Sequence, residues 1–112
     1  MKQQDLVWVK LPFSNLQEEK LRPAIIVSNS NYNSVHNDII LCAITSKIEK
    51  KDYGIIIDDN NLSKGKIPLK SRIRADKIIQ VEKTLVLEIF AQLNSETYDI
   101  LIKEINRIIE RK

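Results

Sequence analysis

Short apolar runs separated by polar segments dominate the chain up to residue 93, and they predict a series of β-strands. Residues 6–11 alternate between apolar and polar positions, which predicts a first strand. A second strand is expected at residues 22–28, around the continuous apolar run 24–27, and a third at residues 39–44, which is again a continuous apolar run. Continuous runs of this kind are typical of strands buried on both faces. Further strands are expected at residues 54–58, 70–81 and 85–93.

The segments between these strands are polar and rich in turn-forming residues. We expect loops at residues 13–21 and 29–38, and a flexible flap within the long connection of residues 59–69. In the last predicted strand every second residue is apolar, so these residues are expected to share one face: Leu85, Leu87, Ile89, Ala91 and Leu93.

The hydrophobic period changes after Asn94, where the pattern predicts a helix. Asn94 is a good N-cap residue, and Glu96 places a carboxylate in the first turn. Apolar residues then recur at helical spacing: Tyr98, Leu101, Ile102, Ile105, Ile108 and Ile109. Five or six strands followed by one helix predict a mainly β fold, a small antiparallel sheet curled into a partial barrel that the helix covers. The length of 112 residues predicts one domain spanning residues 1–112.

Composition excludes several classes of protein. Two glycines are too few for a Gly-rich dinucleotide or phosphate loop, and the single histidine, His36, excludes a ribonuclease mechanism based on two histidines. The single cysteine, Cys42, lies in an apolar run and is expected to be a core residue. No apolar run approaches the ~18 residues of a membrane span, and no residue cluster has metal-ligand spacing. We therefore expect a soluble cytoplasmic protein without metal or cofactor.

The net charge of +3 permits a nucleic-acid partner, but the distribution of cations is more informative. Arg22 stands beside Pro23, whose ring favours an extended conformation for the preceding residue. An arginine held there can meet a phosphate, although an ion pair with Glu18 or Glu19 is an ordinary alternative. Thr45 and Ser46 follow the third apolar run and can donate hydrogen bonds to a phosphoryl oxygen, or simply form a turn.

A second group of charged residues follows the flap. Lys70, Arg72, Arg74 and Asp76 recur with period two, so they are expected to share one face of a strand. Cations at this spacing, about 6.6 to 6.8 Å, suit the phosphates of an extended single strand. The alternatives are a solvated strand face and a surface ion pair between Arg74 and Asp76 worth at most ~1 kcal/mol.

Five segments, in this order, resemble the MazF/PemK family of toxins: residues 6–11, residues 22–29, Ala43-Ile44-Thr45-Ser46, Arg74-Ala75-Asp76 and the C-terminal helix. The resemblance implies an SH3-like barrel, a homodimer, a cognate antitoxin, and metal-independent cleavage of single-stranded RNA such as mRNA. It also implies two catalytic sets, Arg22 with Thr45 and Arg74 with Asp76. Glu18 matches the loop glutamate of the family loosely.

Cleavage of RNA without a metal proceeds by attack of the ribose 2′-OH on the neighbouring phosphorus, so a base must accept the 2′-OH proton. Arginine is protonated at ordinary pH and is a poor base, so Asp76 is the preferred base. Family precedent also gives this role to Arg22. Contacts to RNA are expected from Glu18, Lys20, Ser46, Lys47, Lys70 and Arg72. Two other functions stay open. One is a CcdB-like toxin that binds gyrase without catalysis, although the helix end here lacks the aromatic and small residues of that type. The other is an inactive SH3-like nucleic-acid-binding module.

Overall fold

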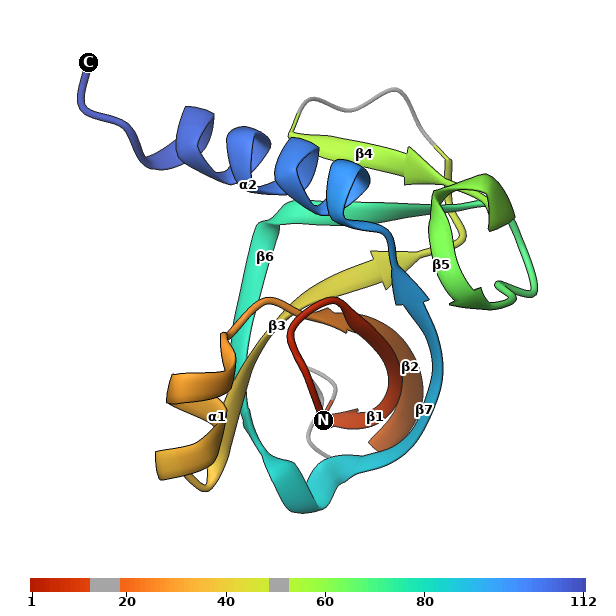
Figure 1. The fold of residues 1–112 in the computed structure, drawn as a ribbon, viewed down its shortest axis with the longest axis vertical. Helices are drawn as coiled ribbons and strands as arrows, with labels where there is room; N and C mark the ends of the chain where they lie inside the picture. Colours follow the sequence, from red (N-terminus) through yellow and green to blue (C-terminus); the bar gives the residue numbers. More distant parts are fainter. Residues whose placement is uncertain (13–18, 49–52) are drawn as a thin grey trace.

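The computed structural model describes residues 1–12, 19–48 and 53–112. Their strands form one seven-stranded antiparallel sheet with the order β4-β6-β3-β2-β1-β7-β5 (Figure 1). The strands are β1 (Asp5–Pro12), β2 (Glu19–Ile26), β3 (Asp38–Thr45), β4 (Gly54–Ile57), β5 (Leu62–Gly65), β6 (Ser71–Glu82) and β7 (Val86–Leu93). The helices are α1 (Ser30–Val35), α2 (Ser95–Ile109) and two 3-10 turns, η1 (Asp59–Asn61) and η2 (Lys83–Leu85).

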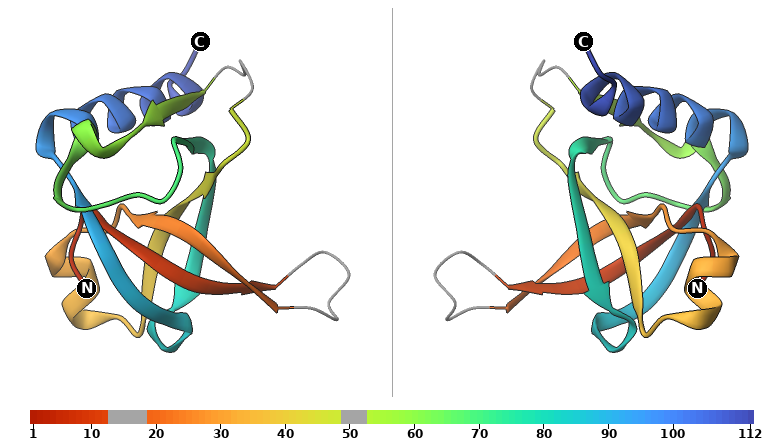
Figure 2. Two further views of the ribbon diagram at one scale, coloured as in Figure 1. Left: turned by 90° about the vertical axis from the view of Figure 1, so that its right-hand side faces the viewer. Right: turned by 90° about the vertical axis from the view of Figure 1, so that its left-hand side faces the viewer.

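The sheet curls on itself, and α2 lies across its open side next to β4 and β6 (Figures 1 and 2). Two apolar clusters fill the structure. One lies inside the curl and is built on Val7, Val9, Ala24, Ile26, Ile39, Leu41 and Val81. The other lies beneath α2 and includes Leu6, Ile25, Cys42, Ile44, Ile57, Ile73, Leu93, Tyr98, Leu101 and Ile105. The predicted fold class, a mainly β partial barrel with a C-terminal helix, is confirmed.

The C-terminal helix begins where the sequence predicts. The Asn94 side chain accepts a hydrogen bond from the Thr97 backbone N–H at 2.8 Å. Leu101 and Ile105 are buried, but Ile109 is 69% exposed, so the predicted apolar stripe extends beyond the surface that the sheet covers. Neither α-helix in the described part of the chain is long and apolar enough to cross a membrane.

Two predicted connections contain regular structure. Residues 30–35 form α1, because the Asn29 side chain caps it and the buried Asn33 side chain donates to the Ser28 carbonyl at 3.0 Å. The connection of residues 59–69, expected to be a flexible flap, contains η1 and β5, and β5 pairs with β7. The predicted loop at 13–21 is shortened from one side because β2 already begins at Glu19; residues 13–18 lie outside the described residues.

The prediction that alternate residues of β7 share one face is wrong. The pairing of β7 with β1 shifts twice, between Leu6 and Val7 and between Trp8 and Val9. Each shift inserts an extra residue and reverses the alternation beyond it. Ala91 and Leu93 are therefore buried, whereas Leu87 and Ile89 are 54% and 48% exposed.

Candidate active site

The ends of β2 and β3 bring together the arginine and threonine predicted from the sequence. β2 pairs with β3 through Ala24, Ile25 and Ile26, opposite Ala43, Cys42 and Leu41. Continuing this register by two residues sets Arg22 opposite Thr45. The ladder stops before that point because Pro23 has no backbone N–H to donate. Arg22 lies inside β2, where it pairs with Val9 of β1, because the strand begins at Glu19 and not at residue 22 as predicted.

Arg22 and Thr45 line one cavity of about 230 Å³. The remaining lining residues come from β1, β2, the end and exit of β3, the segment before β6, the start of β6, and β7: Trp8, Pro23, Ile44, Ser46, Lys47, Ile67, Pro68, Leu69, Ser71 and Phe90. Four predicted site residues, Arg22, Thr45, Ser46 and Lys47, are thus neighbours in space. We call this cavity the arginine–threonine pocket.

The Thr45 hydroxyl is held in a defined position. Thr45 is half-buried, and its Oγ1 accepts a hydrogen bond from the Lys47 backbone N–H at 3.2 Å. A hydroxyl has one proton to donate in addition to its lone pairs, so this contact leaves the Thr45 proton available to a ligand. Arg22 is exposed and carries a permanent positive charge. The pocket therefore combines a fixed cation with a hydroxyl donor, the groups that bind a phosphoryl oxygen.

The wall formed by residues 67–69 is tied down at both ends. The Ile67 backbone N–H donates to the Asp59 carboxylate at 2.8 Å, and the Ser71 hydroxyl donates to the Leu69 carbonyl at 2.8 Å. Trp8 and Phe90 also line the pocket, and their ring centroids lie 5.1 Å apart at an interplanar angle of 31°. Sequence reasoning missed these residues as part of the site. The available signals were the aromatic residue in β1 and the proline within the connection of residues 59–69.

The second predicted catalytic set does not line the arginine–threonine pocket. Arg74 and Asp76 pair with each other on β6, through Nε and Oδ1 at 3.3 Å and through Nη2 and Oδ2 at 3.2 Å. Thr45 lies opposite Arg72, and four further residues of strand to Asp76 span about 13 Å. The hydrogen bond and charge of Arg74 lower the pKa of Asp76 below its usual value, which makes the paired carboxylate a weaker base.

Arg72 requires a correction, because the sequence predicted an exposed contact to RNA. The residue is only 6% exposed. Its side chain lies against Gly54, where an added Cβ would stand 2.7 Å from Nη1, and its buried Nε has no hydrogen-bond partner among the described residues. Arg72 is therefore not exposed beside Lys70 and Arg74 on the strand face that was predicted to contact RNA. Lys20 and Lys70 are exposed, as RNA contacts require, but neither lines the pocket. Glu18 lies outside the described residues.

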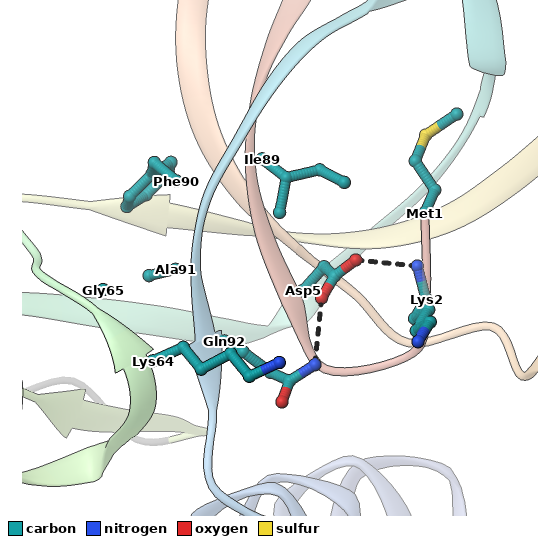
Figure 3. A pocket seen from close by; sticks show the side chains of 9 residues that line it. All are labelled: Met1, Lys2, Asp5, Lys64, Gly65, Ile89, Phe90, Ala91 and Gln92. Carbon is teal, nitrogen blue, oxygen red and sulfur yellow. Dashed lines mark hydrogen bonds between the residues drawn. The ribbon is translucent and has the colours of Figure 1, made fainter.

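A second cavity, of about 350 Å³, lies between the N-terminal residues and the strands β5 and β7 (Figure 3). Asp5 is buried there, and its carboxylate accepts hydrogen bonds from the Lys2 backbone N–H at 2.8 Å and the Gln92 side chain at 3.2 Å. The Asp5 carboxylate therefore has hydrogen-bond partners within this cavity, and none of the predicted catalytic residues lines it. Phe90 lines both cavities and separates them.

The remaining reactive side chains lie outside the pocket. Cys42 is a fully buried core residue, as predicted, and burial raises its pKa to about 12, so it is a thiol at neutral pH. His36 is exposed and stacks on Tyr32 of α1. Among the described residues no three His, Cys, Asp or Glu side chains come close enough to hold a metal ion.

The chain has a curled antiparallel sheet that one helix closes, with a cationic pocket at the rim. These features place it in the class of small β-barrel proteins. Within that class, residues 2–109 match the family described as the PemK-like, MazF-like toxin of type II toxin-antitoxin systems. The chain belongs to this family. Among curated protein sequences, none matches the chain.

Solved structures of low sequence identity share the fold. An endoribonuclease in complex with its cognate antitoxin, from mycobacterial species, superposes with a TM-score of 0.81 at 14% identity, over 100% of this chain and 97% of that one. The toxin MazF-mt6 of Mycobacterium tuberculosis gives 0.78 at 13% identity, over 96% and 98%. A MazE–MazF structure from Deinococcus radiodurans gives 0.81 at 15% identity, over 100% and 98%. At these identities the likeness shows the fold alone.

Proposed function

We propose that the chain is the toxin of a type II toxin–antitoxin system and a metal-independent endoribonuclease that cleaves single-stranded RNA at short sequence motifs. The observation that carries the proposal is the arginine–threonine pocket. Arg22 and Thr45 come from different strands and line one cavity together with Ser46 and Lys47. An RNA phosphate can reach these side chains because they line a surface cavity, whereas it could not reach a polar cluster buried in the core.

The reaction we propose is attack of a ribose 2′-OH on the adjacent phosphorus. The 2′-oxygen forms a bond to phosphorus, the bond to the 5′-oxygen breaks, and the products are a 2′,3′-cyclic phosphate and a free 5′-hydroxyl. Arg22 stabilises the charge that develops on the non-bridging oxygens, and Thr45 donates a hydrogen bond to one of them, with Ser46 beside it. Preorganised donors of this kind typically contribute about 100- to 1,000-fold each in rate.

Asp76 is a weaker candidate for the base than the sequence suggested. Its carboxylate is engaged by Arg74, and its pKa is lowered. No residue lining the pocket, within the described part of the chain, carries a carboxylate or an imidazole. We propose that Arg22 and Thr45 form the primary catalytic pair, that water accepts the 2′-OH proton, and that water also supplies the proton taken up by the leaving 5′-oxygen. Arg74 and Asp76 assist from outside the pocket.

The partners follow from the same proposal. Lys20, Lys47 and Lys70 contact phosphates along the strand, and the antitoxin competes with RNA for this surface. Large apolar side chains remain exposed on a single copy, among them Ile78, Leu87 and Ile89, which supports a homodimer. An enzyme acting on mRNA, with its single cysteine buried as a thiol, belongs in the cytoplasm.

The proposal is tested by incubating the purified chain with a single-stranded RNA of mixed sequence in EDTA and mapping the new ends. We expect cleavage at a limited set of sites, with 2′,3′-cyclic phosphate and 5′-hydroxyl ends. A matched RNA with 2′-deoxyribose at the mapped site removes the nucleophile and should stay intact there. Intact RNA in the first experiment, or cleavage of the deoxy substrate, would contradict the mechanism.

The two alternative functions are less favoured. A gyrase-binding toxin would need no cation and hydroxyl together at the ends of β2 and β3. An inactive nucleic-acid-binding module would place no constraint on Arg22 and Thr45, yet both line one cavity.

A further inference from the structure

We propose that Trp8 and Phe90 form the binding site for one nucleobase next to the phosphodiester, so that the arginine–threonine pocket also reads the RNA. The inference rests on the proposed function, since it assigns a base subsite to the same pocket. The two rings line the cavity that Arg22 and Thr45 line. A base held there belongs to a nucleotide adjoining the bound phosphate.

Regular pairing places Trp8 beside this cavity, and a register shift places Phe90 there. Trp8 pairs with Pro23 of β2, so the two side chains share a face and Pro23 lines the cavity too. Phe90 is the extra residue at the first register shift between β1 and β7, where Leu6 faces Ala91 and Val7 faces Ile89. Bulges of this kind often redirect a side chain next to a functional site.

The cavity has the size and lining for a planar aromatic group. Its volume of about 230 Å³ is below the ~300–1,000 Å³ of sites for drug-sized ligands, so it takes a fragment such as one base. Ile67 and Pro68 provide an apolar wall, and the hydrogen bonds of Asp59 and Ser71 hold it in place. Trp8 and Phe90 stand beside these apolar neighbours, which favours stacking of a base on this wall, while the cation and hydroxyls of the pocket face the phosphate.

Both rings remain accessible in part. Trp8 and Phe90 are half-buried; Phe90 packs against the cluster beneath α2 without being one of its buried residues, and Trp8 belongs to neither cluster. The rings tilt by 31° against each other, and both line the cavity, so a ligand in the cavity can reach the pair. Stacking on such a ring tolerates any base, and the polar rim of Thr45 and Ser46 can then discriminate between base edges.

Trp8 is the only tryptophan of the chain, so its fluorescence reports on this site alone. The probe is a single-stranded RNA carrying 2′-O-methyl groups throughout, which cannot be cleaved by 2′-OH attack. We expect saturable quenching of Trp8 emission with the same midpoint as fluorescence anisotropy of the labelled RNA. Replacing single nucleotides by abasic residues should abolish quenching at one position and leave it unchanged at distant ones. RNA that binds by anisotropy without changing Trp8 emission would overturn the subsite.

Variants give a second test. Trp8→Leu should weaken binding of this RNA by about 5- to 100-fold, as expected for the loss of one stacked base. Trp8→Phe should stay within a few-fold of the wild type, and Tyr32→Leu, which removes a ring on α1, should bind normally. Thermal melting checks that the variants fold, and the abasic series needs no variant. Equal binding by folded Trp8→Leu would overturn the subsite.

The two proposals fail in different ways. Quenching without any cleavage of unmodified RNA would leave the base subsite standing and contradict the nuclease. Cleavage with unchanged Trp8 emission would leave the nuclease standing and contradict the base subsite. Absence of RNA binding by both readouts would contradict both.

Discussion

Two arginine sites in this molecule have similar residue types and different surroundings. Arg22 lines a cavity with the Thr45 hydroxyl at the ends of two strands. Arg74 lies on β6 and is engaged by Asp76, with the two side chains 37% and 39% exposed. The first arrangement presents a cation and a hydroxyl at one cavity, whereas the second is an ion pair that lies outside that cavity. The comparison supports the proposal that Arg22 contacts the substrate directly, because of the two arginines only Arg22 shares this cavity with a hydroxyl.

The largest expected effect separates the two arginines directly. Arg22→Ala should lower the single-turnover rate of RNA cleavage by about 100- to 1,000-fold or more, because it removes a preorganised charge. Arg74→Ala should lower the rate less, since its charge is shared with Asp76 and lies outside the pocket. Cleavage of one labelled RNA by both variants, with circular dichroism as the check on folding, makes the measurement. Equal losses would mean that both sets act on one phosphodiester.

The threonine is expected to matter through its hydroxyl and not its shape. Thr45→Val keeps the volume and removes the donor, and we expect a loss of about 100-fold in the cleavage rate. Thr45→Ser retains the hydroxyl and is the matched control, with a rate close to the wild type. If the valine variant cleaves as well as the serine variant, Thr45 has no role in stabilising the transition state.

A substitution at Gly54 tests how tightly the buried Arg72 side chain is packed; Arg72 belongs to neither proposed catalytic set. A Cβ at this position would stand 2.7 Å from Arg72 Nη1 and 3.0 Å from the Ile73 carbonyl. Gly54→Ala should therefore lower the free energy of unfolding by about 1–3 kcal/mol through overpacking, measured by urea denaturation. Gly54→Ala combined with Arg72→Ala should recover part of the loss if the guanidinium is the obstacle. No recovery would assign the clash to the backbone.

The smallest effect concerns the pH dependence of the ion pair. The pKa of Asp76 is lowered in the folded state, so the pair stabilises the fold above the unfolded pKa of about 3.9. That contribution disappears as the pH falls through the folded value. Because both side chains are exposed, Asp76→Asn should cost less than about 1 kcal/mol at pH 7 and nothing at low pH. A difference in unfolding free energy that persists at low pH would contradict this.

The strands and the C-terminal helix were predictable because their signals are local. Alternation in β1, apolar runs in β2 and β3, and the cap at Asn94 each lie within a few residues. The exposure of Leu87 and Ile89 was not predictable from the sequence. It depends on register shifts in the pairing of β7 with β1, and no pattern within a few residues indicates such shifts. The helix α1 depends likewise on the buried hydrogen bonds of Asn33 with Ser28.

The candidate site was predictable in part, for a similar reason. The sequence identified Arg22, Thr45, Ser46 and Lys47, and strand register brings them together. The prediction that Arg72 is exposed was wrong. A period of two indicates which residues share a face of the strand, but it does not show which neighbouring residues cover that face. Trp8 and Phe90 are far apart in the chain and meet only through the pairing of β1 with β7.

The most direct test of where the phosphodiester binds uses the arginine side chains themselves. In ¹⁵N-labelled protein, the Nε–H resonances of Arg22 and Arg74 can be assigned from the two alanine variants and followed during titration with uncleavable 2′-O-methyl RNA. We predict a large, saturable shift for Arg22 and a small one for Arg74. A large shift for Arg74 with an unchanged Arg22 would show that RNA binds at the ion pair and would contradict the central claim.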